Sequence, residues 1–173
     1  FLIAERWEED DLPTVLTYGH GDTVPPMAGR WAEGREPLTL TPAGDRLYGR
    51  GTADNKGQHH VNLTALEAVL AVRGALGFNL RVLIEMGEEA GSPGLHELCL
   101  AEREALSADA LIASDGPRLT AGQPLIFGGA RGCIGFSLEV DLRHGAHHSG
   151  NWGGLLADPS ILLAHALATI TDA

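Results

Sequence analysis

Residues 14–22 read Thr-Val-Leu-Thr-Tyr-Gly-His-Gly-Asp, a β-branched and apolar run that leads directly into a polar loop. Pro13 precedes the run, and a short apolar segment bounded by turn residues is typical of a buried strand. The stretch therefore predicts a buried strand that delivers His20 and Asp22 to a loop at its end. Loops at strand ends are the usual place for reactive side chains in sheets flanked by helices.

Strands and helices alternate along the chain after this stretch. Residues 38–40 and 46–48 flank a turn-rich link and predict a hairpin. Asp54 or Asn55 can cap a long helix whose apolar residues recur at helical spacing as far as Gly74. The pattern then predicts a strand, a helix and a third strand, at residues 80–86, 94–106 and 108–113. Such alternation indicates an α/β fold with a mostly parallel sheet flanked by helices.

The pattern changes after residue 129. From Cys133 to Leu142, small or polar residues alternate with apolar ones, which predicts an antiparallel-type strand with one buried face. A loop rich in Gly and His follows at 145–154, and Asp158 with Pro159 begins a predicted apolar helix. We therefore expect a first domain at residues 1–129 and the start of a smaller α+β domain at residues 130–173.

Composition argues against several classes of protein. The chain has 173 residues and a formal net charge of −11, with only 12 Lys and Arg residues, so we expect no nucleic-acid partner. No apolar run approaches the roughly 18 residues of a membrane span, and no signal-peptide pattern opens the sequence. We expect a cytoplasmic protein that does not bind membranes. Cys99 and Cys133 lack the spacing of zinc or redox sites and are predicted to be buried free thiols.

Five acidic residues and one histidine occupy similar places in the predicted fold. Each of them follows a predicted strand or lies at the start of the long helix. The set comprises His20, Asp22, Asp54, Glu88, Glu89 and Asp115. Carboxylates gathered at one edge of a sheet repel one another unless cations neutralise them. Carboxylates with an imidazole suit zinc or manganese, and a carboxylate that bridges two ions holds them about 3.5 to 4 Å apart. The sequence therefore predicts a two-metal site, with Asp54 as the bridging candidate.

Each part of this pattern has an ordinary structural explanation when it is taken alone. His20 with Asp22 can form a turn that caps backbone groups, and Asp115 can be a turn residue. Glu88 and Glu89 can be a solvated pair favoured by the dipole of the helix that follows. The combined pattern favours metal binding, with Glu89 as a ligand and Glu88 as the base that takes a proton from a metal-activated water.

The other histidines give weaker signals. No functional role is assigned to three histidines on predicted helices, where structural imidazoles are common: His59, His60 and His165. The spacing of His144, His147 and His148 could chelate a metal on a helix, but the glycines around them favour a loop. We prefer a loop histidine that touches substrate.

Four stretches resemble the motifs of the two-metal aminoacylase and carnosine-dipeptidase superfamily, which includes glutamate carboxypeptidase, acetylornithine deacetylase and succinyl-diaminopimelate desuccinylase. They are YGHGDTVP at 18–25, YGRGTADNKG at 48–57, EMGEEAG at 85–91 and SDG at 114–116, and their order and spacing also fit. The resemblance implies a zinc-peptidase-like catalytic domain. Its cofactors would be two divalent metal ions, with zinc first and manganese or cobalt as the other candidates.

Site roles follow from the same resemblance. It implies that His20, Asp54 and Asp115 hold one metal and that Asp54 and Glu89 hold the other. Glu88 then acts as the general acid and base. Asp22 orients the ligand His20, as outer carboxylates commonly do for imidazole ligands.

The second predicted domain is similar to the family's smaller lid domain. Residues 129–132 and the alternating strand resemble its entry, and this lid usually mediates dimerisation, so we expect a homodimer. Residues 148–154, His-Ser-Gly-Asn-Trp-Gly-Gly, look like the lid motif of the dipeptidase branch. That likeness implies that His148 binds substrate and donates to the developing oxyanion, often across the dimer.

The resemblance implies a metal-dependent hydrolase that cleaves the peptide or amide bond of a dipeptide or small peptide. A deacylase or desuccinylase acting on N-acyl amino acids would use the same centre. A non-catalytic dimerisation or metal-binding fragment is the alternative from another class. The family's polypeptides are more than twice this length, and their final histidine ligand, which lies beyond the lid, has no match here. We therefore expect an incomplete copy, as the start at Phe1 and the end at Ala173 also indicate.

Overall fold

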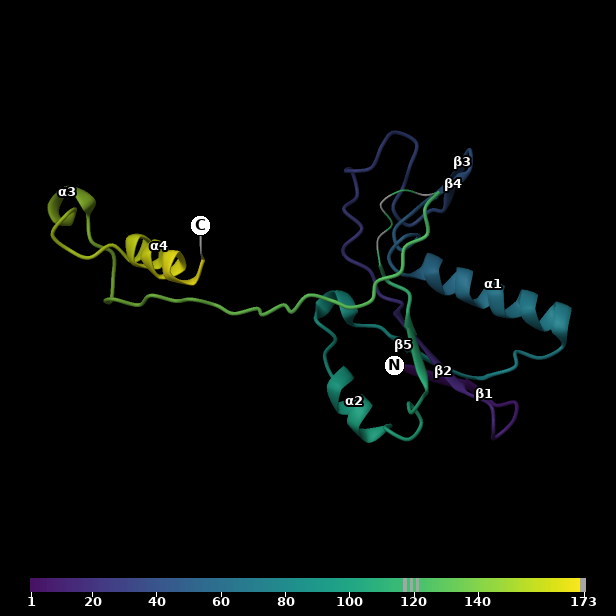
Figure 1. Ribbon diagram of the computed structural model, residues 1–173. Coiled ribbons are helices and arrows are strands. Elements are labelled where there is room, and N and C mark those ends of the chain that lie inside the picture. Colours follow the sequence, from purple (N-terminus) through teal and green to yellow (C-terminus); the bar gives the residue numbers. More distant parts are fainter. Residues whose placement is uncertain (117, 119, 121, 172–173) are drawn as a thin grey trace. The chain divides into compact units, whose positions relative to one another are not determined.

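The computed structural model describes residues 1–116, 118, 120 and 122–171 (Figure 1). The chain divides into two compact units, Phe1–Ile126 and Phe127–Ala173, and each is described by itself. The predicted α/β class is confirmed. The assignment of residues 1–129 to a catalytic domain and of 130–173 to a lid domain stays a prediction.

A four-stranded sheet in the order β1-β5-β2-β6 forms the centre of the first unit. Its strands are β1 (Leu2–Arg6), β2 (Thr14–His20), β5 (Asn79–Glu85) and β6 (Ala110–Ala113). β2 pairs in parallel with both β5 and β6, which confirms the mostly parallel sheet. β1 pairs antiparallel with β5 and was missed, because a short strand at the start of the sequence has no turn residue before it.

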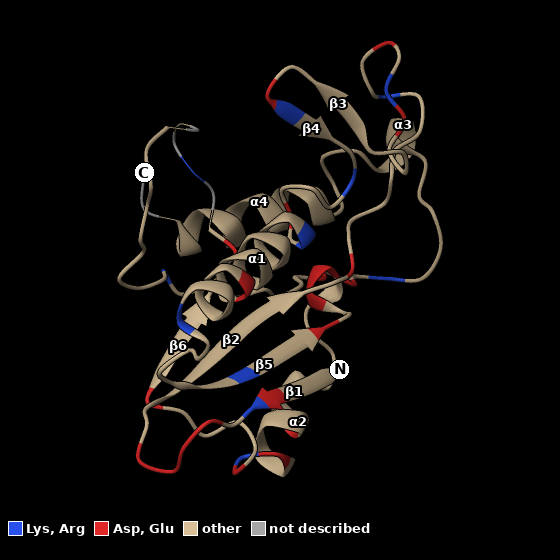
Figure 2. Ribbon diagram, turned by 90° about the vertical axis from the view of Figure 1, so that its right-hand side faces the viewer, with Lys and Arg blue, Asp and Glu red and all other residues tan. Residues whose placement is uncertain are grey.

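The register of the sheet brings the ends of the parallel strands to one edge. β2 and β5 pair from Thr14 with Asn79 to His20 with Glu85, so the two strands end together. The pairing of β2 with β6 ends earlier, at Tyr18 with Ala113. Figure 2 shows the arrowheads of β2 and β5 pointing the same way, with acidic residues in the segments that follow. The polar loops after these strands therefore share the carboxyl edge of the sheet.

The helix α1 (Lys56–Arg73) ends where the sequence predicts, with Gly74 in the left-handed conformation at φ 76° and its N–H bonded to the carbonyl of Leu70. The half-buried residues of α1 include His59 and Asn62 near its start and apolar residues such as Leu66 further along. Polar contacts therefore lie near the start of the helix, and apolar packing lies further along it.

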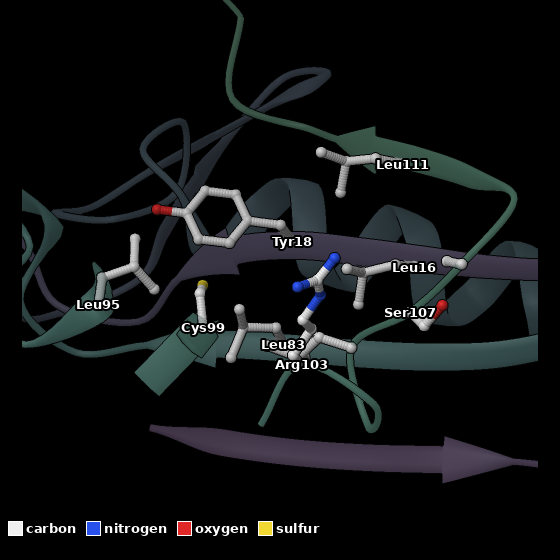
Figure 3. A pocket seen from close by; sticks show the side chains of 10 residues that line it. Leu16, Tyr18, Leu83, Leu95, Cys99, Arg103, Ser107 and Leu111 are labelled. Atoms are coloured by element: carbon white, nitrogen blue, oxygen red, sulfur yellow. The ribbon is translucent and has the colours of Figure 1, made fainter. Parts of the chain in front are cut away.

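The helix α2 (Leu95–Ala101) is shorter than the predicted 94–106. The Arg81 guanidinium donates to the carbonyls of Glu104 and Ser107, which holds the residues after α2 in turns. Beside α2 lies an open hollow of about 460 Å³ lined mainly by apolar side chains such as Leu16 and Leu83 (Figure 3). None of the predicted metal ligands, all of which the structure describes, lines this hollow.

The prediction that both cysteines are buried is wrong, because both are exposed. Cys99 lies on α2 and lines the open hollow, which leaves its thiol accessible. Cys133 lies in a segment that forms no regular element, so nothing in that segment covers it. An apolar sequence neighbourhood therefore did not produce burial at either position.

The predicted hairpin forms between β3 (Thr41–Ala43) and β4 (Arg46–Tyr48), which pair antiparallel. Its first strand lies three residues later than predicted, because the tight turn needs only Gly44 and Asp45. Gly44 has φ 63°, a conformation that glycine adopts without strain.

The second unit contains the short helix α3 (Ser149–Trp152) and the helix α4 (Pro159–Ile170). Asp158 caps α4 by accepting the N–H of Ser160 at 2.8 Å, as the sequence predicts. The strand predicted at 133–142 is wrong, since these residues form none. A strand needs a partner, and the structure gives residues 133–142 no pairing, so Ile134 stays 84 % exposed. No helix among the described residues is long and apolar enough to cross a membrane.

Candidate metal centre

His20 is the fully buried centre of the predicted site, at the end of β2. Its Nε2 atom lies 2.9 Å from Asp54 Oδ1 and 3.5 Å from Asp115 Oδ2. Glu88 Oε2 lies 3.7 Å from the same nitrogen. Three acidic side chains, carried by the segments after three different elements, thus converge on one ring nitrogen.

Asp22 holds the other side of the imidazole ring. His20 Nδ1 lies 3.2 Å from the backbone carbonyl of Asp22 and 3.3 Å from its Oδ1 atom. Both oxygens are acceptors, so the neutral ring carries its proton on Nδ1. The lone pair of Nε2 then faces the three carboxylates, an arrangement that is repulsive unless a cation lies between them. This geometry fits a divalent metal.

The carboxylate of Asp22 also fixes the turn that carries the two glutamates. Its Oδ1 accepts the N–H of Glu88 at 3.2 Å, and its Oδ2 accepts the N–H of Glu89 at 3.1 Å. Burial raises the pKa of Asp22, but these backbone donors outweigh burial and the net shift is downward. One side chain therefore orients both the histidine and the glutamate turn, in agreement with its predicted orienting position, although its role stays a prediction.

The short 3-10 helix Glu88–Ala90 presents Glu88 and Glu89 after β5. Two groups of side chains place their ligand atoms within 4.8 Å of one another: His20 with Glu88 and Glu89, and His20 with Asp54 and Asp115. The structure thus brings together all six predicted site residues of the first unit. Imidazole nitrogen with carboxylate oxygens is the donor set expected for zinc or manganese.

The close packing of these charged side chains shifts the pKa values of Glu88 and His20. Burial raises the pKa of Glu88, and the nearby carboxylates of Asp115 and Asp54 raise it further, against the opposing effect of His20. Burial lowers the pKa of His20, but the same carboxylates outweigh burial, so the net shift is upward. Both shifts include the effect of the negative charges that crowd this edge of the sheet.

Glu85 is a buried acidic residue that was not singled out from the sequence. It is fully buried at the end of β5, and its Oε1 accepts from Ser92 Oγ at 2.9 Å and from the Tyr18 hydroxyl. Burial and then Glu85 raise the pKa of Tyr18, which keeps the phenol protonated and able to donate. The signal in the sequence was a glutamate that directly follows the apolar run at residues 82–84.

Asn55 and His59 are two further residues whose contacts were not predicted. Asn55 occupies the N-cap position of α1, but its side chain makes no capping hydrogen bond. It is fully buried and bonds instead to the ends of β2 and β6. His59 reaches the carbonyl of His20 from the next turn of the same helix. The expectation of a capping side chain is therefore wrong for Asn55, because tertiary partners take its polar atoms.

His148 belongs to the second unit, so its predicted contact with substrate stays a prediction. It is the N-cap residue of α3, and its Nδ1 accepts the N–H of Gly150 at 3.1 Å. The neutral ring then carries its proton on Nε2, which leaves that N–H free of the capping bond. His147 meets Trp152 edge-on, with ring centroids 6.1 Å apart.

Residues 16–157 match the sequence model of a family described as Peptidase family M20/M25/M40. The chain is 36 % identical to Beta-Ala-His dipeptidase of Mus musculus over 174 residues, which cover 99 % of this chain and 35 % of that protein. It is 38 % identical to cysteinylglycine-S-conjugate dipeptidase of Corynebacterium striatum over 173 residues, covering 99 % and 36 %. The crystal structure of human carnosine dipeptidase 1 matches with a TM-score of 0.66 at 33 % identity, covering 99 % of this chain and 36 % of that one. The chain thus spans about a third of the length of these relatives.

Proposed function

This chain belongs to peptidase family M20/M25/M40, and from that membership we propose that the protein containing it is a metal-dependent dipeptidase. The observation that carries the proposal is the convergence of Asp54, Asp115 and Glu88 on Nε2 of the buried His20. Relatives named as dipeptidases, one for Beta-Ala-His and one for cysteinylglycine S-conjugates, support the choice of short peptides as substrates.

We assign His20, Asp54 and Asp115 to one divalent ion, and Asp54 with Glu89 to a second. The first group is supported by its ligand atoms, which lie within 4.8 Å of one another. Asp54 suits a bridging position because its side chain is 63 % exposed while one oxygen lies 2.9 Å from His20. Zinc is the first candidate, with manganese and cobalt next. When bound, such ions supply Lewis acidity that lowers the pKa of water and polarises the scissile carbonyl.

Glu88 is the proposed proton carrier. Its Oε2 reaches the same ring nitrogen as the ligands, so it faces the place where a water and a scissile amide would meet. Its raised pKa brings the carboxyl closer to the working range of a general acid and base. Asp22 accepts the Glu88 N–H and so holds the backbone from which this side chain projects. Glu88 would take a proton from the water and deliver it to the leaving amine.

His148 is proposed to donate its Nε2 hydrogen to the oxygen of the substrate carbonyl as negative charge develops there. Support comes from the bond between His148 Nδ1 and the N–H of Gly150, which keeps the ring proton on the other nitrogen. A homodimer formed through the second unit would let His148 of one copy serve the other copy.

The test is a hydrolysis assay on the natural-length protein that contains these 173 residues, loaded with Zn²⁺ and offered dipeptides and N-acetyl amino acids in parallel. We expect turnover of dipeptides that stops when a chelator removes the metal. A clear preference for the N-acetyl amino acids would overturn the substrate class in favour of a deacylase. No hydrolysis of either class would overturn the enzymatic proposal and favour a binding or dimerisation role.

A further inference from the structure

The side-chain amide of Asn55 joins β2 and β6 beyond the last backbone pair of these strands. That pair is Tyr18 with Ala113. Past it, Asn55 Oδ1 accepts the N–H of His20 at 3.2 Å, and Nδ2 donates to the carbonyl of Ser114 at 2.7 Å. A carboxamide from the start of α1 thus continues the connection between two strands at the point where each delivers a candidate metal ligand.

The same amide also orients the candidate ligand Asp115. The second hydrogen on Nδ2 goes to Asp115 Oδ1 at 2.8 Å. The other carboxylate oxygen, Oδ2, lies 3.5 Å from His20 Nε2. Because Asn55 has one acceptor atom and two N–H groups, and all three are used, its amide has a single satisfied orientation. Asp115 therefore presents one defined oxygen towards His20.

His59 holds the same histidine from the next turn of α1. Its Nε2 lies 3.0 Å from the carbonyl of His20, and since a carbonyl only accepts, this nitrogen donates. The backbone of His20 is thus held at its N–H by Asn55 and at its carbonyl by His59. Both side chains pack closely on Gly19, where a Cβ atom would lie 2.5 Å from Asn55 Oδ1 and 2.5 Å from His59 Cε1.

We propose that Asn55 and His59 form a clamp, here named the α1 clamp, that positions His20 and Asp115 for metal binding. Neither residue is placed as a ligand or as a group that touches substrate, so both act through the residues that they hold. The inference rests on the proposed function, because positioning has a measurable effect only if these side chains bind a metal. Groups that orient metal ligands typically contribute a factor of about 10 to 100 in metal affinity.

Asn79 offers a matched control for a purely structural role. It is fully buried like Asn55, but it lies at the start of β5, at the other end of the sheet. Its Oδ1 accepts the N–H groups of Glu8 and Glu9, and its Nδ2 donates to the carbonyls of Glu9 and Leu12. Loss of either asparagine leaves buried polar groups unpaired, so loss of stability alone does not separate the two roles.

The experiment is a calorimetric titration of the full chain with Zn²⁺ alone, at a temperature where the metal-free form of each variant is folded. We expect Asn55→Ala to bind Zn²⁺ about 10- to 100-fold more weakly than the unchanged chain. We expect His59→Ala to bind more weakly as well, and His59→Gln to recover affinity because its amide N–H can donate to the same carbonyl. Asn79→Ala should melt at a lower temperature yet keep the original affinity.

Three results would contradict either the α1 clamp or the proposed function on which it rests. Original affinity in both Asn55→Ala and His59→Ala, with binding lost in Asp54→Ala, would overturn the clamp and leave the metal site standing. If Asn55→Ala does not fold, equal affinities of His59→Ala and His59→Gln would overturn the clamp. Absence of Zn²⁺ binding in the unchanged chain would instead contradict the proposed function itself.

Discussion

The two ends of the central sheet are held by the same kinds of hydrogen bond, but they differ in how the negative charge of their carboxylates is balanced. At the amino end, the carboxylate of Glu8 accepts the N–H groups of Leu76 and Gly77, at 2.9 to 3.0 Å. At the carboxyl end, Asp22 accepts the two successive N–H groups of Glu88 and Glu89 in the same way. Each end also contains one fully buried asparagine that bonds to neighbouring segments.

The difference lies in the additional carboxylates. Glu8 also pairs with Arg6 at 3.1 Å, so the amino end contains its own positive charge. At the carboxyl end, the acidic side chains gather around the imidazole of His20, whose Nδ1 already faces Asp22. Similar hydrogen bonds therefore hold a network whose charges pair with one another at the amino end, and a cluster of carboxylates that a bound cation would neutralise at the carboxyl end.

The largest expected effect comes from removing a shared ligand. Asp54→Ala in the natural-length protein should reduce dipeptide turnover to background, because Asp54 is assigned to both ions. Asp109→Ala removes a carboxylate from the other end, where Asp109 Oδ2 accepts the N–H of Thr14 at 2.8 Å. We expect this control to melt earlier and to remain active. Equal activity in the two variants would contradict the proposed difference between the amino and carboxyl ends of the sheet.

A second prediction separates metal binding from proton transfer. Glu88→Gln keeps the size of the side chain but cannot accept the proton, so turnover should fall by about 10²- to 10⁴-fold. Bound zinc, measured by mass spectrometry on the same sample, should be retained. Full activity would exclude Glu88 as the base, and loss of the metal would make it a ligand instead.

A third prediction concerns the support beneath the glutamate turn. Tyr18→Phe removes the hydroxyl that donates to the buried Glu85 and should lower the free energy of unfolding by about 1.5 kcal/mol, the upper end for a typical hydrogen bond. Urea denaturation of the metal-free chain measures this change. Tyr48→Phe is the control, because the ring that stacks with Arg35 is kept. Equal stability of Tyr18→Phe and the unchanged chain would show that Glu85 does not depend on this donor.

The smallest expected effect is a pH dependence at the amino end. Backbone N–H groups of Leu76 and Gly77 lower the pKa of Glu8 below its usual 4.5. A carboxyl with a lowered pKa in the folded state stabilises the protein above pH 4.5, and this contribution is lost as the pH falls through the folded-state value. The melting temperatures of Glu8→Gln and the unchanged chain should therefore converge as the pH falls below 4.5. A gap that stays constant from neutral to acidic pH would contradict this account.

The candidate ligands could be predicted because each lies at the end of a strand or the start of a helix that has a strong local pattern. The apolar run before His20 predicted β2, and the parallel register then placed His20 beside the end of β5. The strand predicted from the alternating residues 133–142 was wrong. Such a pattern indicates which face of a strand can be buried, but it does not supply a partner strand.

The supporting residues could not be predicted from local pattern, because their partners lie far away in the sequence. Asn55 bonds to residues 35 and 59 positions away, and His59 bonds to one 39 positions away. An asparagine before a helix reads as a cap in the sequence. Only the fold shows that its side chain is used between two strands.

The zinc content of the chain shows whether the carboxyl end of the sheet binds metal. The 173-residue chain would be loaded with Zn²⁺, desalted and weighed by native mass spectrometry, beside Asp54→Ala treated in the same way. We expect at least one zinc ion to be retained per unchanged chain and zinc to be lost from the variant. An unchanged chain that retains no zinc, or a variant that retains as much, would contradict the claim that the carboxyl end of the sheet is a metal centre.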